Sequence, residues 1–291
     1  MKMRRERYAS LSEAVNGSLE VVPQRSRGTT KIYSLSTFMH ERFPSIVGLY
    51  QAKKSRIRNH LSFYYSDSRV RAFLDDLFFD VFGELPSDRP ANLPRWPDKR
   101  RVMFCSNQVL HVVRTLTGDN SHPPYSILDS LERKVNYLGG FLYRAATVTY
   151  GVRPMASTHN ERRRPRVDVN ASSEKLELLK KIKTLMARLS IRTKECIDGL
   201  YVMNVRSLNR IVSLGLLSPS AGDKLEGLLD EFRNYWSSPD LVLVGNPGVR
   251  GMLNRLGRKK ADGILERNSE EIDEEMVRLV EQAKRGRLVL E

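Results

Sequence analysis

The sequence predicts an α+β protein with two pseudo-symmetric halves in one chain, followed by a helical C-terminal region. Two observations predict this architecture. Two glycine-marked segments of helical character occur at 46–54 and 138–146. Each is then followed by β-rich runs and amphipathic helices in a similar order. We expect a basic N-terminal extension at 1–34, a first repeat at 35–120, a second repeat at 121–217 and a helical C-terminal region at 218–291.

The first repeat alternates between strand and helix patterns. An apolar and aromatic run predicts a strand at 61–65, and apolar residues at helical spacing predict a helix at 67–82. A Pro-rich stretch at 85–97 predicts a loop. A strand at 101–105 and a short helix at 107–116 complete the repeat.

The second repeat has the same order of strand and helix patterns. A β-rich run ends the segment 143–150, and a second strand is expected at 167–169. A helix with an apolar stripe is expected from 172 to 189. The pair Asp198-Gly199 predicts a hairpin, and a closing helix is expected at 207–214.

The spacing of equivalent residues favours duplication over chance similarity of two α+β stretches. Gly48 and Gly140 are 92 residues apart, and Leu110 and Leu208 are 98 apart. The larger second spacing means that the second repeat contains additional residues, and we place them in a loop expected at 151–165. Insertion into a surface loop is a low-cost way for repeats to diverge.

The C-terminal region changes to helical patterns. An amphipathic helix is expected at 220–235, and a last helix from Asn268 to Gly286 has acidic residues early and basic residues late. We expect this region to support the second repeat or to make an accessory contact, and its helices are candidates for binding a protein partner.

Composition favours a phosphate-rich partner. The chain has 49 basic and 34 acidic residues, a net charge of +15 and a pI near 9.9, which indicates DNA or RNA in preference to acidic lipid. Cys105 and Cys196 are not in a C-x-x-C pair, so neither a disulfide framework nor a cysteine zinc site is expected. No apolar run approaches 18 residues and no signal-peptide core follows the N-terminus. We expect a cytoplasmic protein that has no cofactor and does not bind membranes.

The two glycine-marked segments read IVGLYQAKK (46–54) and LGGFLYRAA (138–146). Together with the order of elements, they resemble the LAGLIDADG homing-endonuclease family over about residues 35 to 217. The resemblance implies two αββαββα repeats whose motif helices pack together at a pseudo-twofold axis. It implies close helix contact at Gly48, Gly139 and Gly140, because glycine lets two backbones approach. A monomer would then be sufficient for the pseudo-dimer.

The same resemblance places the catalytic acids of the family at Lys53 and Ala145, and its final glycines at Lys54 and Ala146. Neither Lys53 nor Ala145 can supply the oxygen ligands that a hard divalent cation needs. The motif therefore predicts no metal site, no catalytic residue and a chain that is not an enzyme. Catalytically degenerate relatives such as the WhiA-type regulators provide a parallel.

Basic residues concentrate where this fold presents strands and loops on a concave face. Arginine and lysine there would neutralise phosphates in a salt-dependent manner, and arginine also suits guanine edges. Trp96 is a further candidate contact. The predicted nucleic-acid-binding residues are Lys53, Lys54, Arg56, Arg58, Arg95, Lys99, Arg100, Arg101, Arg153, Arg162, Arg163, Arg164 and Arg166.

These observations predict a regulatory or architectural protein that binds double-stranded DNA without nuclease activity. Two alternatives stay open. One is a diverged endonuclease whose acids come from elsewhere, for instance Asp67 or Asp168. The other is an RNA-binding intron maturase or ribonucleoprotein component.

Overall fold

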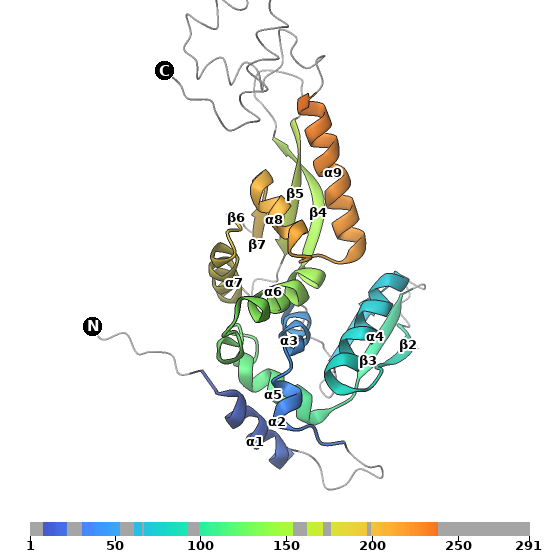
Figure 1. Ribbon diagram of the computed structural model, residues 1–291, viewed down its shortest axis with the longest axis vertical. Coiled ribbons are helices and arrows are strands. Elements are labelled where there is room, and N and C mark those ends of the chain that lie inside the picture. Colours follow the sequence, from blue (N-terminus) through green and yellow to red (C-terminus); the bar gives the residue numbers. More distant parts are fainter. Residues whose placement is uncertain are drawn as a thin grey trace, which may run out of the picture. The chain divides into compact units, whose positions relative to one another are not determined.

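The computed structural model describes residues 8–21, 31–52, 61–65, 67–91, 99–153, 162–170, 176–196 and 199–237 (Figure 1). The chain divides into two compact units, one formed by 1–149 and 166–225 and the other by 150–165 and 226–291. No helix in the described ranges is long and apolar enough to cross a bilayer.

The order of elements is that of an α+β protein, as predicted. The part of the chain up to residue 117 contains α1 (Leu11–Val21), α2 (Leu35–Phe38), α3 (Phe43–Ala52), β1 (Leu61–Tyr65), α4 (Ser68–Phe82), β2 (Ser87–Pro90), β3 (Arg100–Phe104) and α5 (Asn107–Thr117). The following part contains a short 3-10 helix (Tyr125–Ile127), α6 (Leu131–Ala145), β4 (Ala146–Arg153), β5 (Arg162–Asn170), α7 (Leu176–Arg188), β6 (Lys194–Cys196), β7 (Gly199–Val202), α8 (Val205–Ser213) and α9 (Pro219–Ser237).

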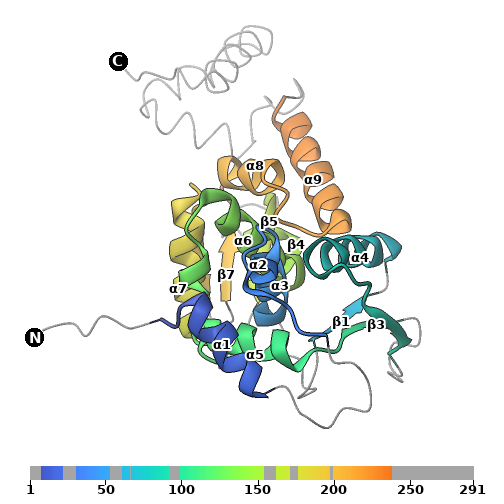
Figure 2. The ribbon, with the colours of Figure 1, turned by 60° about the horizontal axis from the view of Figure 1, so that its bottom comes forward.

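Two antiparallel sheets contain all the strands of the described residues. Their strand orders are β1-β3-β2 and β4-β5-β7-β6. In each sheet the strand that comes last in the sequence lies between the two that precede it, β3 between β1 and β2 and β7 between β5 and β6. Helix α4 covers one face of the first sheet, where Phe78 packs against Phe63 and Phe104 (Figures 1 and 2).

The helix boundaries follow from local sequence. Asp67, Ser106 and Ser130 precede α4, α5 and α6, and each side chain accepts a hydrogen bond from a backbone N–H of the first turn. Gly83 and Gly118 end α4 and α5 with positive φ values of 64° and 51°. Glycine adopts this left-handed conformation at little cost, which is why these helices stop there.

Helix α3 is the central element of the core. Every residue from Phe43 to Ala52 is buried, including the polar Ser45 and Gln51. A helix that is buried on all sides must be surrounded by other elements. Its principal neighbour is α6, which is buried along one face from Tyr137 to Ala145 (Figure 1).

Four elements of the described residues were not predicted: β2, α1, and the short helices α2 and Tyr125–Ile127. The expected loop at 85–97 contains the edge strand β2, which has only four residues and ends in Pro90. The expected N-terminal extension contains α1, which lies beside α5 in both views and buries Ala14 and Val15 (Figures 1 and 2). The predicted last helix at 268–286 lies outside the described residues.

Candidate nucleic-acid interface

Helices α3 and α6 cross with their backbones in contact. A Cβ atom on Gly48 would collide with the carbonyl oxygen of Tyr137 and the amide nitrogen of Phe141. A Cβ atom on Gly140 would collide with the carbonyl oxygen of Ser45. The two contacts are reciprocal, because each glycine meets the carbonyl one helical turn before the other glycine. Side chains at either position would push the helices apart.

Gly139, the third glycine expected at this interface, is not part of the crossing. An added Cβ atom there would meet only Leu216 Cδ2, at an ordinary van der Waals distance of 3.9 Å. The crossing is supported instead by Ser45, whose Oγ donates a hydrogen bond to the carbonyl oxygen of Asn136 at 3.0 Å. The structure thus brings two of the three glycines together.

A buried polar network lies between the same two helices. Tyr137 donates its hydroxyl to Gln51 Oε1 at 2.7 Å, and Gln51 Nε2 donates to the carbonyl oxygen of His122 at 3.0 Å. Burial raises the pKa of Tyr137 well above its usual value, so the phenol stays protonated and keeps its donor role. Sequence reasoning missed Gln51, because the motif alignment directed attention to the next positions along the helix.

Arg144 joins the C-terminal end of α6 to α3 and to the first sheet. Its Nη1 atom donates to the carbonyl oxygens of Leu49 at 3.2 Å and Ser62 at 3.5 Å. The guanidinium lies 5.1 Å from the centre of the Phe63 ring. Burial lowers the pKa of Arg144 to about 10, so the group remains charged at neutral pH. A cation beside the last carbonyls of a helix is electrostatically favourable.

These residues do not fit the divalent cation that the family resemblance implies. The acid position of the second segment is the buried Ala145, and the adjacent side chain is the cationic Arg144. Hard cations require carboxylate or carbonyl oxygens and are repelled by a guanidinium. Across the described ranges, no group of three or more His, Cys, Asp or Glu side chains could hold a metal ion. Lys53, the acid position of the first segment, lies outside the described residues.

The two acids considered as substitutes are both engaged with other groups. Asp67 caps α4 and its carboxylate lies 3.5 Å from Arg69, which also forms an ion pair of 2.6 Å with Asp223. Asp168 accepts hydrogen bonds from Thr149 and Arg166. Their carboxylates are therefore already paired with donors in this structure.

The face of the first sheet that α4 does not cover carries Tyr64, Arg89 and Arg101. Arg101 of β3 lies directly opposite Tyr64 of β1 and Arg89 of β2. Like charges facing each other across antiparallel strands repel. Neither arginine forms an ion pair with a described residue, and Arg101 Nε is buried without a hydrogen-bond partner. An anion placed on this face would relieve the repulsion between Arg89 and Arg101.

Arg100 does not share this face, although it was predicted to act in one cluster with Arg101. Its Nε donates to Asp88 at 2.7 Å, and its register partner is Tyr65, so the alternation of side chains places Arg100 on the side of the sheet covered by α4. Lys99 precedes β3, and its carbonyl accepts a hydrogen bond from Ala91. Arg89 was missed because the sequence does not show that β2 pairs with β3, and that pairing places Arg89 opposite Arg101.

The second sheet also has one buried and one open face. Val167 and Val169 of β5 are buried, as are their register partners Val202 and Leu200 of β7. Because side chains alternate along a strand, Arg166 and Asp168 lie on the opposite face, where Asp168 pairs with Tyr201.

Arg166 is held in place on this open face. Its Nε donates to Asp168 Oδ1 at 2.6 Å, and its Nη2 pairs with the same oxygen. The guanidinium lies 4.3 Å from the centre of the Tyr201 ring, and Thr149 donates its hydroxyl to Asp168 Oδ2 at 2.8 Å. Four side chains from β4, β5 and β7 therefore form one connected group, which we call the Arg166 group.

The remaining predicted contacts lie outside the described side chains. Lys53, Lys54, Arg56, Arg58, Arg95 and Trp96 lie outside the described residues. The structure describes Arg153 as part of β4, and Arg162, Arg163 and Arg164 as part of β5, by backbone alone.

No family model matches the sequence, and no curated protein matches it. Solved structures of I-SmaMI do resemble this chain. A point mutant of I-SmaMI has a TM-score of 0.43 at 12% identity, over 66% of this chain and 90% of that one. I-SmaMI bound to uncleaved DNA target with calcium ions has a TM-score of 0.42 at 13% identity, over 66% and 92%. The meganuclease I-SmaMI bound to uncleaveable DNA has a TM-score of 0.40 at 14% identity, over 82% and 95%.

The comparison corrects one prediction. We expected a chain that is not an enzyme, but the matched structures are those of a meganuclease, so that prediction is wrong. Lys53 and Ala145 bear only on the cation sites that the family motif implies, and the activity of a chain does not follow from those two positions.

Proposed function

We propose that this protein binds double-stranded DNA on the open faces of its two sheets, and that its two halves are pseudo-symmetric repeats joined where α3 crosses α6. The reciprocal contacts of Gly48 and Gly140 support such an axis, as does the matching order of three strands in each sheet. Pseudo-twofold symmetry in a protein suits a duplex, whose two strands run in opposite directions.

The observation that carries this proposal is the pair Arg89 and Arg101. Two guanidinium groups face each other without a described acid, and one of their nitrogens is buried without a partner. Phosphate oxygens would offset the repulsion between these two guanidinium groups. Antiparallel strands are one of the elements that enter DNA grooves, and the net charge of +15 favours association with a polyanion.

Equilibrium binding to a labelled duplex of random sequence, titrated with salt, tests the proposal. We expect the logarithm of the association constant to fall linearly with the logarithm of salt concentration, with a slope of several units. Replacing Arg162, Arg163 and Arg164 by Ala should lower that slope by up to about three contacts. The matched control removes the same charge from α7 and α8 by replacing the exposed Arg188, Arg206 and Arg210 with Ala, and should leave the slope unchanged.

Competition with a structured RNA of equal length distinguishes the partner. Displacement of the duplex by RNA at lower concentration than by unlabelled DNA would overturn the proposal and favour the maturase or ribonucleoprotein alternative. Equal slopes for the strand variant and the helix control would show that the charge acts without a defined binding face.

Cleavage of the bound duplex is the second candidate function, in line with the meganuclease comparison. The acids to test are Asp67 and Asp168. The assay is the incubation of a randomised plasmid library with magnesium or manganese, followed by sequencing of new ends. Cleavage that disappears in Asp67→Asn or Asp168→Asn would assign that acid to the reaction, and cleavage unchanged in both variants would exclude the two.

A further inference from the structure

The Arg166 group has a feature that a simple phosphate contact does not need. Asp168 bonds the edge of the guanidinium formed by Nε and Nη2, while Tyr201 stacks against its plane. Together they fix the orientation of Arg166, and Thr149 fixes the carboxylate in turn. The other edge, formed by Nη1 and the second hydrogen of Nη2, has no partner among the described residues. The Arg166 side chain is 29% exposed.

We infer that Arg166 is a specificity-determining residue that binds the O6 and N7 atoms of a guanine in the major groove. The inference rests on the proposed binding of duplex DNA. Guanine offers two adjacent acceptors on its major-groove edge, which match two donors of a planar guanidinium. An arginine that is already oriented loses less conformational entropy when it makes these two bonds.

Charge separates this role from a phosphate contact. The carboxylate of Asp168 neutralises the guanidinium of Arg166, so the pair attracts a phosphate weakly, and Asp168 itself repels one. The directional donors of Arg166 remain. Binding to a neutral base edge depends on the direction of the hydrogen-bond donors, whereas binding to a phosphate depends mainly on net charge. Arg89 and Arg101 on the first sheet have the opposite properties, since they keep their charge and lack a described acid to orient them.

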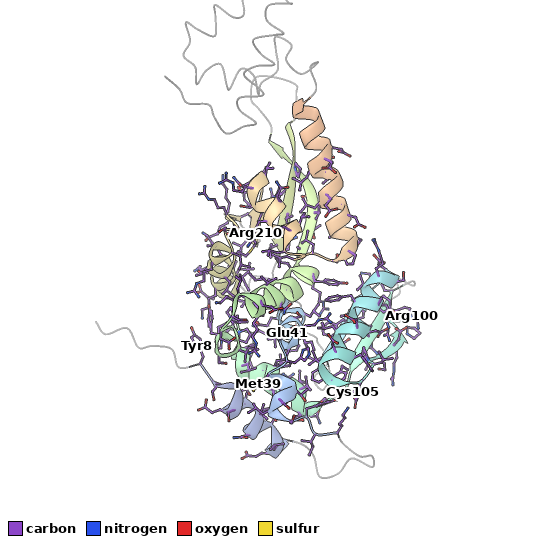
Figure 3. The ribbon with its side chains drawn as sticks, viewed as in Figure 1. Tyr8, Met39, Glu41, Arg100, Cys105 and Arg210 are labelled. Atoms are coloured by element: carbon purple, nitrogen blue, oxygen red, sulfur yellow. The ribbon has the colours of Figure 1, made fainter. Side chains whose placement is uncertain are left out.

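Selection from a randomised duplex library, read by sequencing, tests this role with Arg166→Lys. Lysine keeps the positive charge and loses the planar pair of donors. We expect the wild-type protein to select a guanine at one position and the variant to lose that preference by about 10- to 100-fold. Affinity for random duplex and its salt slope should stay within about twofold, because the charge is unchanged. The control Arg210→Lys on α8 should change neither quantity (Figure 3).

Asp168→Asn tests the inference in a second way, because it should change the affinity for random duplex as well as the guanine preference. Loss of the carboxylate leaves Arg166 charged but less well oriented. We expect weaker discrimination at the same guanine together with tighter binding to random duplex, since one negative charge has left the face. If Arg166→Lys does not fold, as judged by circular dichroism, Tyr201→Leu keeps both charges and should also weaken the preference.

An unchanged selected sequence in folded Arg166→Lys would overturn the inference. So would a wild-type selection without any guanine preference. Neither result affects the proposed function, which fails separately if the wild-type protein shows no salt-dependent affinity for duplex DNA.

Discussion

The two sheets contain three strands in a matching order, β1-β3-β2 and β5-β7-β6, but their arginines have different partners. On the first sheet, Arg89 and Arg101 face each other and lack an acidic partner among the described residues. On the second sheet, Arg166 is paired with Asp168 and stacked on Tyr201. The first arrangement leaves the positive charge of the arginines unneutralised, and the second fixes the orientation of the Arg166 guanidinium. Under the proposed function, the first face attracts the phosphate backbone and the second recognises bases.

The helices between the sheets show the same contrast. Their glycines are equivalent, because close approach demands the same small residue on both sides. Their C-terminal ends are not equivalent, since α3 contributes the neutral Gln51 and α6 contributes the cationic Arg144. The two helices match where close packing requires glycine, and they differ in the polar side chains that follow.

The largest expected effect concerns the crossing itself. Gly48→Ala and Gly140→Ala should each destabilise the protein by about 3 kcal/mol, because the new Cβ atom meets backbone atoms that cannot move aside. Chemical denaturation measures this. Gly139→Ala is the matched control and should be neutral or stabilising by up to about 1 kcal/mol, as for a helical glycine with free space. A large effect at only one of Gly48 and Gly140 would contradict the reciprocal contact.

An intermediate effect is expected on the open face of the first sheet. Arg89→Gln and Arg101→Gln should each lower the salt slope of duplex binding by about 0.9. Each should also stabilise the free protein by up to about 0.5 kcal/mol, because the cross-strand repulsion disappears. Arg100→Gln is the control on the covered side, and should leave the slope unchanged while slightly lowering stability through the loss of its pair with Asp88. Reduced stability in the first two variants would refute the assignment of this face.

The smallest expected effect is acid sensitivity at Asp88. Burial alone would raise its pKa, but hydrogen bonds from Arg100 and Tyr65 outweigh burial, and the net pKa is lowered. A lowered folded pKa contributes stability above the unfolded value of about 3.9 and loses it as pH falls through the folded value. Asp88→Asn should therefore flatten the loss of stability below about pH 4, by under about 1 kcal/mol because the pair is partly exposed. Urea denaturation of both proteins across about pH 2 to 6 measures the free energy of unfolding. Parallel curves of that free energy against pH for the wild type and Asp88→Asn would contradict the prediction.

Local signals predicted most of the helices because their causes are local. The caps Asp67 and Ser106 and the stops Gly83 and Gly118 act within a few residues of the helix ends they define. Strand β2 and helix α1 escaped prediction for the converse reason. A four-residue strand with a proline is stable only by pairing with β3, and α1 is ordered by packing on α5.

The sequence by itself determined the α+β order, the basic character of the chain and the two glycine-marked helices, because periodicity, charge and the absence of a Cβ atom are properties of single residues and short windows. The tertiary structure alone decided that Arg100 and Arg101 lie on opposite faces, that Arg166 is bound to Asp168, and that Arg144 is placed beside Leu49 and Ser62. Strand register and helix crossing bring together groups far apart along the chain. Whether an arginine keeps its charge for a ligand or shares it with a carboxylate depends on those distant neighbours.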